Sequence, residues 1–180
     1  CCIGTSATMG SKENNNNILN YAEEIFGEPF DKDAIITEDR LSAQEFFAGA
    51  DVTEFAMPTA EQAVELEKLS AEDEPSAYLQ SAVKDWLPDF SFDVLDDEGR
   101  IQLGYELMHH SFMQSVINLT GGTYYKVSKI AEDLAIHYPD LKTLPDATVV
   151  INSLFALISH ARTGKVGKLR PFLNVQVDPK

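Results

Sequence analysis

One apolar segment, residues 147–161 with the sequence ATVVINSLFALISHA, constrains the fold more than any other part of the chain. It is shorter than the roughly 20 apolar residues that cross a bilayer. It also contains the polar residues Asn152, Ser153, Ser159 and His160. We therefore expect a helix that is buried inside the protein, with other helices packed around it.

Apolar residues recur at helical spacing in several further stretches, and prolines and glycines separate these stretches. The connections between them are short, which favours antiparallel neighbours. We therefore predict an all-α fold: a compact antiparallel bundle of about five to seven helices, with segment 147–161 at its centre. The first helix is predicted at residues 15–26 and the longest at 97–119. The others begin near residues 42, 59, 75, 123 and 145, and Gly164 is expected to end the last one.

Short motifs mark three of the helix starts. The pairs with the spacing of a capping box are Ser42 with Glu45 and Thr59 with Gln62. Leu41 and Phe46 have the spacing of the hydrophobic staple that accompanies such a box. Pro75 is expected at a first helical position, where its missing N–H costs no hydrogen bond.

Two segments alternate apolar and polar residues at period two, as strands do. They are FSFDV at residues 90–94 and LNVQV at residues 173–177. We expect them to pair as a minor two-stranded ribbon that packs on the helices, because an isolated ribbon is unstable. Together with the chain length, this predicts one helical domain at residues 15–180 and a flexible polar tether at residues 1–14, which ends in an asparagine-rich run.

The net charge of −15 comes entirely from the first part of the chain. Residues 1–100 carry 23 acidic and 6 basic side chains, whereas residues 101–180 carry 6 and 8. An acidic surface repels phosphate backbones and anionic headgroups, so we expect neither nucleic-acid binding nor electrostatic membrane docking. A basic partner surface, or solubility alone, accounts better for the charge.

Cys1 and Cys2 are the only cysteines. Neighbouring cysteines rarely form a disulfide, and no second pair exists for a zinc site. An N-terminal cysteine followed by the polar stretch 4–17 resembles a mature bacterial lipoprotein, which carries diacylglycerol on the sulfur of its first residue. The resemblance implies lipidation of Cys1. Cys2 is not the aspartate that retains such proteins in the inner membrane, so it implies an outer-membrane anchor facing the periplasm or the cell surface. In the alternative, translation starts at Met9 and no lipid is attached.

Glu106 and His109 lie three residues apart and share one face of a helix. This Glu-x-x-His spacing is half of a ferritin-like di-iron set, but the chain has no second copy. A mononuclear iron or zinc site of Glu106, His109 and His137, or a haem bound through His109, remains an alternative. The structural interpretation is that His109 and His110 hydrogen-bond at the edge of the core.

The residues Arg162, Lys165, Lys168 and Arg170 form the densest basic cluster in the sequence. They are interpreted either as a contact for an acidic partner or as a contact with the acidic part of the same chain. No serine lies in a Gly-x-Ser-x-Gly motif, so no catalytic triad is predicted.

These observations predict a lipid-anchored helical protein of the bacterial envelope that binds a partner protein, as pilotins, assembly factors and immunity proteins do. No catalytic residue and no cofactor is predicted. The alternative function is a helical protein that binds iron, zinc or haem through Glu106, His109 and His137.

Overall fold

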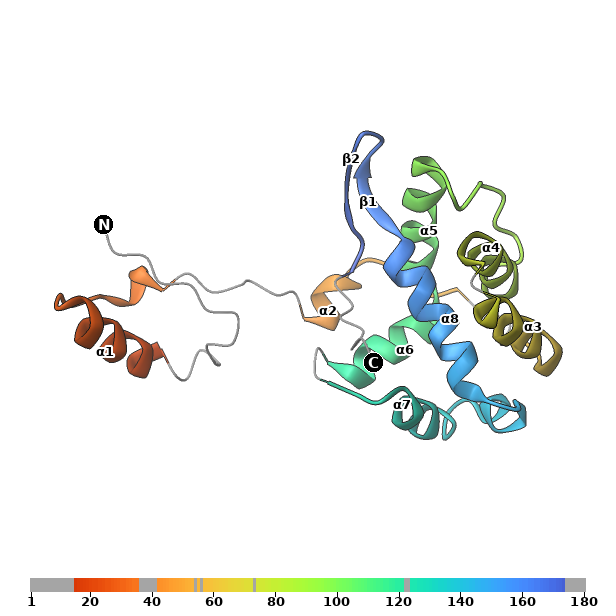
Figure 1. Cartoon of the computed structure of the whole chain (residues 1–180), viewed down its shortest axis with the longest axis horizontal. Coiled ribbons are helices and arrows are strands. Elements are labelled where there is room, and N and C mark those ends of the chain that lie inside the picture. The colour runs from red at the N-terminus through yellow and green to blue at the C-terminus, as the bar shows by residue number, and fades with distance from the viewer. Residues whose placement is uncertain are drawn as a thin grey trace. The chain divides into compact units, whose positions relative to one another are not determined.

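The computed structural model describes residues 15–35, 42–53, 55, 57–72, 74–121 and 124–173. The all-α prediction is confirmed: this described part contains eight α-helices and one two-stranded antiparallel sheet (Figure 1). Its contacts divide the chain into two compact units, Cys1–Arg40 and Leu41–Lys180. The domain boundary expected after residue 14 stays a prediction.

The first unit contains helix α1 (Asn15–Phe26) and the 3₁₀ turn η2 (Lys32–Ala34). The helix has the bounds that the sequence predicted. It ends at Gly27, which adopts the left-handed conformation with φ 72° and donates its N–H to the carbonyl of Glu23 at 2.8 Å. Phe26 and Phe30 meet edge to face. None of the described side chains of this unit is fully buried.

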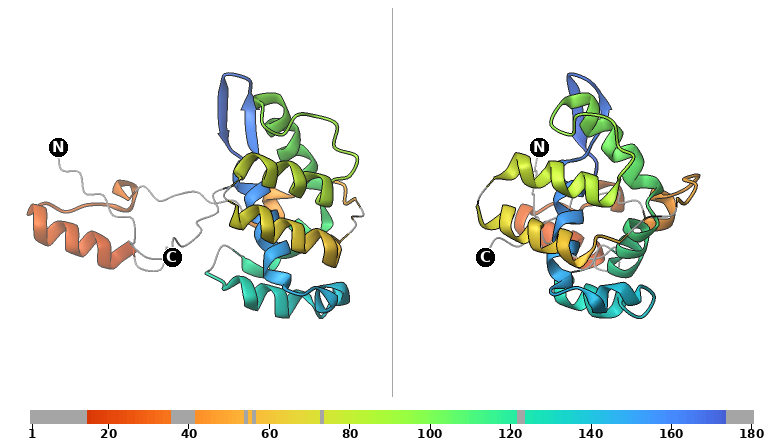
Figure 2. Two further views of the ribbon diagram at one scale, coloured as in Figure 1. Left: turned by 45° about the vertical axis from the view of Figure 1, so that its right-hand side comes forward. Right: turned by 90° about the vertical axis from the view of Figure 1, so that its right-hand side faces the viewer.

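The second unit contains the remaining elements. They are α2 (Ala43–Phe46), α3 (Ala60–Ala71), α4 (Pro75–Trp86), α5 (Asp97–His109), α6 (Ser111–Thr120), α7 (Val127–Leu134), η3 (Pro139–Thr143), α8 (Ala147–His160), β1 (Arg162–Lys165) and β2 (Lys168–Pro171). Helix α8 contacts α3, α4, α5 and α7 and so lies at the centre of this unit, as predicted for the most apolar segment (Figure 2).

The predicted helix starts are present. Both capping boxes form, with reciprocal hydrogen bonds between Ser42 and Glu45 and between Thr59 and Gln62. Pro75 is the first residue of α4. Leu41, half of the predicted staple, lies outside the described residues.

The prediction of a single helix at 97–119 is wrong, because the helix is interrupted at His110. The backbone of His110 is extended, and its Nδ1 accepts the N–H of Met113 at 3.3 Å, which caps α6. At the same point Thr53 donates both its N–H and its hydroxyl to the carbonyl of His109, at 2.8 and 3.0 Å. That carbonyl therefore bonds to a distant segment instead of continuing the helix, which the local apolar spacing could not indicate.

The strand predicted at 90–94 is also wrong. This segment is an irregular loop in which the N–H of Phe90 bonds back to the carbonyl of Leu87 at 2.9 Å, and Val94 is buried. Residues 174–177 of the other predicted strand lie outside the described residues. The observed ribbon is β1 with β2. The last helix was predicted to continue to Gly164, but α8 ends at His160 and β1 follows it.

The core is one cluster of buried side chains contributed by α3 to α8. Trp86 and Phe112 stack at its centre with their ring centroids 5.3 Å apart. Phe55 and Tyr138 pack against these rings. The largest fully buried apolar side chains of the cluster are Trp86, Phe112, Leu66, Leu103, Leu107, Met113, Ile130, Ile151, Leu154, Leu157 and Ile158.

Candidate functional site

The structure brings the four basic residues predicted to bind a partner onto one β-hairpin, residues 162–171, which we call the basic hairpin. Its two strands pair antiparallel in a register that sets Lys165 opposite Lys168 and Thr163 opposite Arg170. The hairpin follows α8 directly and projects beyond the ends of the neighbouring helices (Figures 1 and 2).

The period-two geometry of a strand separates the four cations into two groups. Successive residues of a strand point to opposite faces, and residues paired across strands share a face. In the observed register, Lys165, Lys168 and Arg170 therefore share one face of the hairpin. Arg162 belongs to the other face, together with Leu169.

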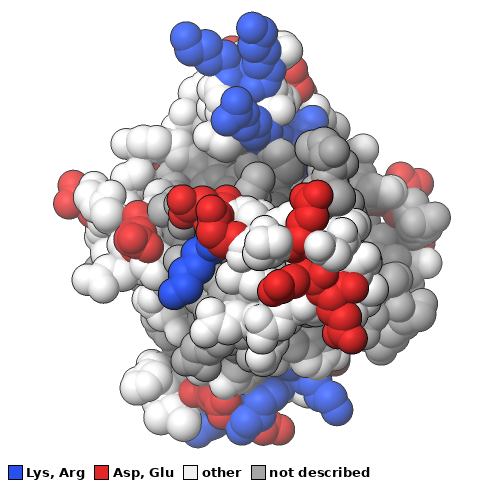
Figure 3. All heavy atoms as spheres, turned by 90° about the vertical axis from the view of Figure 1, so that its left-hand side faces the viewer, with Lys and Arg blue, Asp and Glu red and all other residues white. Residues whose placement is uncertain are grey.

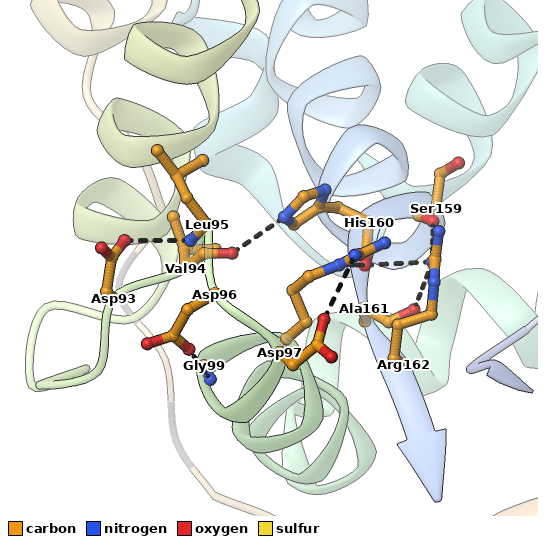
Figure 4. A network of polar contacts seen from close by, with 11 residues as sticks. Asp93, Val94, Leu95, Asp96, Asp97, Gly99, Ser159, His160, Ala161 and Arg162 are labelled. Atoms are coloured by element: carbon orange, nitrogen blue, oxygen red, sulfur yellow. Dashed lines mark hydrogen bonds and ion pairs between the residues drawn. The ribbon is translucent and has the colours of Figure 1, made fainter. Parts of the chain in front are cut away.

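The side chain of Arg162 forms hydrogen bonds within the protein. Its Nη1 donates hydrogen bonds to the carbonyls of Ser159, His160 and Ala161, at 2.7, 3.0 and 2.7 Å (Figure 4). These carbonyls form the C-terminal end of α8, which carries partial negative charge. Arg100 reaches the same end through Nε, which donates to the carbonyl of His160 at 3.2 Å. Burial and then the nearby charge of Arg100 lower the pKa of Arg162. Arg162 thus anchors the hairpin to α8.

A second set of polar contacts ties the loop before α5 to the same end of α8 (Figure 4). The ring Nε2 of His160 lies 2.8 Å from the carbonyl of Val94. Burial lowers the pKa of His160, so the ring is neutral at pH 7 and donates from Nε2 to this carbonyl. Asp96 accepts the N–H of Gly99 at 2.6 Å and caps α5. Hydrogen bonds therefore hold the end of α8, from which the hairpin extends, against the loop before α5.

Gly104 of α5 lets the hairpin approach closely. A Cβ atom at this position would lie 2.6 Å from the carbonyl oxygen of Arg162 and 3.1 Å from the ring of Phe172. Phe172, just after β2, meets Phe46 of α2 edge to face, with the centroids 5.6 Å apart. Gly104 was not predicted from the sequence, because a lone glycine in a helical pattern does not show what packs against it.

The other three cations point to solvent and have no polar partner among the described residues. Lys165, Lys168 and Arg170 are exposed, and their side chains form no ion pair or hydrogen bond with another described residue. Figure 3 shows one group of basic side chains at the hairpin end of the molecule, at the top of the view, and a second group, mixed with acidic side chains, at the opposite end. The exposed tip residue Val166 adds an apolar contact point beside them. Within the described residues of the second unit, no acidic side chain forms an ion pair with this face.

The three residues predicted as metal ligands are not brought together. Among the described residues, no three His, Cys, Asp or Glu side chains form a group that could hold a metal ion. Glu106 instead accepts a hydrogen bond from Gln102 at 2.8 Å, and the ring Nδ1 of His109 lies 2.8 Å from the carbonyl of Tyr105. His137 is exposed after α7. A haem bound through His109 stays a prediction, and Cys1 lies outside the described residues.

Two hollows of about 280 and 290 Å³ lie on the surface of the second unit. The first lies where α3 begins, beside η3, and the second lies between α3, α4 and α8. Neither is lined by a histidine or a cysteine. The second is lined by Glu67, Ser70, Ala71, Tyr78, Val149 and Asn152.

Comparison of the chain with protein-family models, curated proteins and solved structures finds no significant match. Among the described helices, none has both the length and the apolar composition to cross a membrane.

Proposed function

We propose that the chain is a protein-binding module whose basic hairpin docks an acidic surface of a partner protein. One observation carries the proposal: three cations that pair with no other described residue share one face of a projecting hairpin, in a chain with a net charge of −15. An acidic partner is repelled by most of the molecule and attracted at the hairpin. The charge pattern therefore orients the encounter.

The repulsion between neighbouring cations on the hairpin supports a binding role. Lys165 and Lys168 lie directly opposite each other, and like charges at paired positions destabilise a sheet. A carboxylate of a partner placed between them would turn this repulsion into attraction. The apolar tip at Val166 suits a protein surface, which combines apolar contacts with a charged rim.

Nucleic acid is a poorer partner for the same face. Binding to a phosphate backbone depends on the number of cations that reach it, and the hairpin offers three. The net charge of −15 would repel a long polyanion from the rest of the molecule. A compact acidic patch on a protein needs to approach only the hairpin, so it meets less of this repulsion than a long polyanion does.

Photo-crosslinking in the source cells tests the proposal. A photoreactive amino acid replaces Val166 in the full chain, and the variants are Lys165→Glu, Lys168→Glu and Arg170→Glu combined. The matched control makes the same change of charge at exposed lysines away from the hairpin: Lys84→Glu, Lys126→Glu and Lys142→Glu. We expect a discrete protein adduct that the hairpin variant loses, that the control keeps, and whose mapped site on the partner is acidic.

An adduct of equal yield in both variants would contradict the role of the hairpin charges. An adduct that nuclease digestion removes would contradict a protein partner. The lipid at Cys1 and the outer-membrane location are separate proposals that rest on the resemblance to lipoproteins. The intact mass of protein expressed from its complete gene and extracted from membranes tests the lipid.

A further inference from the structure

Helix α1 has an apolar face that its own unit covers only in part. Ile18, Tyr21, Ala22 and Ile25 follow the spacing i, i+3, i+4 and i+7, and Phe26 extends the face. Tyr21, Ile25 and Phe26 are 61%, 59% and 38% exposed, whereas Ile18 and Ala22 are half-buried. A helix gains most of its stability by burying such a face, so this one fits a surface outside its own unit.

The polar face of α1 is acidic. Glu23 and Glu24 lie on it, and residues 15–35 contain five acidic side chains against the single basic residue Lys32. Helices that lie on membranes carry lysine and arginine on their polar face, because anionic lipids attract them. The charge of α1 has the opposite sign, which disfavours a lipid surface.

We infer that α1 is a docking helix that inserts its apolar face into a groove with a basic rim on a partner protein. The i, i+3, i+4, i+7 anchors are those of helix-in-groove recognition. Lysine or arginine residues along the rim would pair with Glu23 and Glu24, and this charge complementarity selects the partner. The helix is already formed, so less ordering entropy opposes binding.

This docking helix is distinct from the basic hairpin, because the two elements require partner surfaces of opposite charge. The hairpin fits an acidic surface, whereas α1 fits an apolar groove with a basic rim. A charge reversal on the hairpin should therefore leave binding by α1 intact, and the two proposals can fail separately.

A paired crosslinking experiment on the full chain tests the inference. A photoreactive amino acid is placed at Tyr21 on the apolar face or, as the matched control, at Asn20 on the polar face, in the source cells. We expect a protein adduct from position 21 and little from position 20. The crosslinked peptide of the partner should lie in an apolar groove flanked by lysine or arginine.

The purified partner then allows the affinity to be measured. Tyr21→Ala and Ile25→Ala should each raise Kd about tenfold, and Asn20→Ala should leave Kd unchanged. Alanine favours the helix, so circular dichroism should show α1 retained in all three variants. Glu23→Lys combined with Glu24→Lys should also weaken binding, and added salt should reduce this effect.

Several outcomes would overturn the inference. In crosslinking, they are the absence of any adduct, equal adducts from positions 20 and 21, adducts of position 21 only with this same chain, and a mapped site with an acidic rim. In binding, an unchanged Kd for Tyr21→Ala would do the same. So would co-sedimentation of the full chain with phosphatidylglycerol vesicles that depends on Tyr21.

Discussion

Trp86 donates its indole N–H to the hydroxyl oxygen of Ser153 at 2.9 Å, and this hydrogen bond joins α4 to α8 inside the core. Ser153 in turn donates to the carbonyl of Val150 at 2.7 Å. Trp86 and Ser153 are 1% and 0% exposed. A polar residue within the most apolar helix is thus satisfied on both sides, as buried polar groups require.

Replacing Ser153 with alanine should destabilise the protein. Ser153→Ala removes the acceptor and leaves the indole N–H of Trp86 buried without a partner, which lowers the free energy of unfolding by about 1–3 kcal/mol. Urea denaturation followed by tryptophan fluorescence measures this loss. Ser159→Ala is the matched control, because that side chain is exposed, and its effect should stay within about 0.5 kcal/mol. Equal effects of the two variants would contradict the role of the buried bond.

His110 makes the stability depend on pH. Its ring is 1% exposed and lies against Phe55 and Trp86, with centroid distances of 4.8 and 5.5 Å. Nδ1 accepts the N–H of Met113, so Nε2 carries the proton in the neutral ring, and Nε2 makes no hydrogen bond within the described structure. Burial lowers the pKa of His110 to about 4, and a main-chain interaction with Trp86 opposes part of this shift.

The pKa of His110 in the unfolded chain is about 6.5, above that of the folded state. As pH falls from about 6.5 to about 4, His110 becomes protonated in the unfolded chain but stays neutral in the folded state. The free energy of unfolding therefore decreases over this range. At pH values below this range, the total loss of unfolding free energy is about 3 kcal/mol. His110→Asn keeps a capping side chain without the titration. Urea denaturation across the window should show a shallower pH dependence in this variant, and equal slopes would refute the assignment to His110.

Gly104 should reverse the usual effect of a glycine-to-alanine change in a helix. Helix propensity alone predicts that Gly104→Ala raises the free energy of unfolding by up to about 1 kcal/mol. Because the added Cβ would meet the carbonyl of Arg162 at 2.6 Å, we expect a decrease of about 1–3 kcal/mol instead. Thermal or urea denaturation gives the sign. A stabilised variant would show that α5 and β1 are not in close contact.

Lys168→Glu should affect stability and docking in opposite directions. The new carboxylate lies opposite Lys165, and an oppositely charged pair at such positions stabilises a sheet by about 0.2–1 kcal/mol. The same change removes one cation of the docking face, so the crosslinking yield from position 166 should fall. Lys126→Glu, away from the hairpin, should change neither quantity. A simultaneous loss of stability and docking would indicate a structural role for Lys168.

Local patterns were sufficient to predict much of the helical fold. The bounds of α1, both capping boxes, the start of α4 at Pro75 and the central position of α8 follow from apolar spacing and from groups within a few residues of each other. The break at His110 depends instead on Thr53, which lies far away in the sequence. Such a hydrogen bond does not change the spacing of apolar residues around His110, so the sequence pattern cannot indicate it.

For the candidate site, the sequence by itself determined that four cations lie close together near the C-terminus. Which of them face solvent was decided only by the tertiary structure. A helix continued to Gly164 would have placed these residues at a period of 3.6, whereas the hairpin repeats at two and separates Arg162 from Lys165, Lys168 and Arg170. The helix ends earlier because Arg162 bonds to the last carbonyls of α8 and β1 packs on Gly104. These contacts between distant segments exist only after the chain has folded.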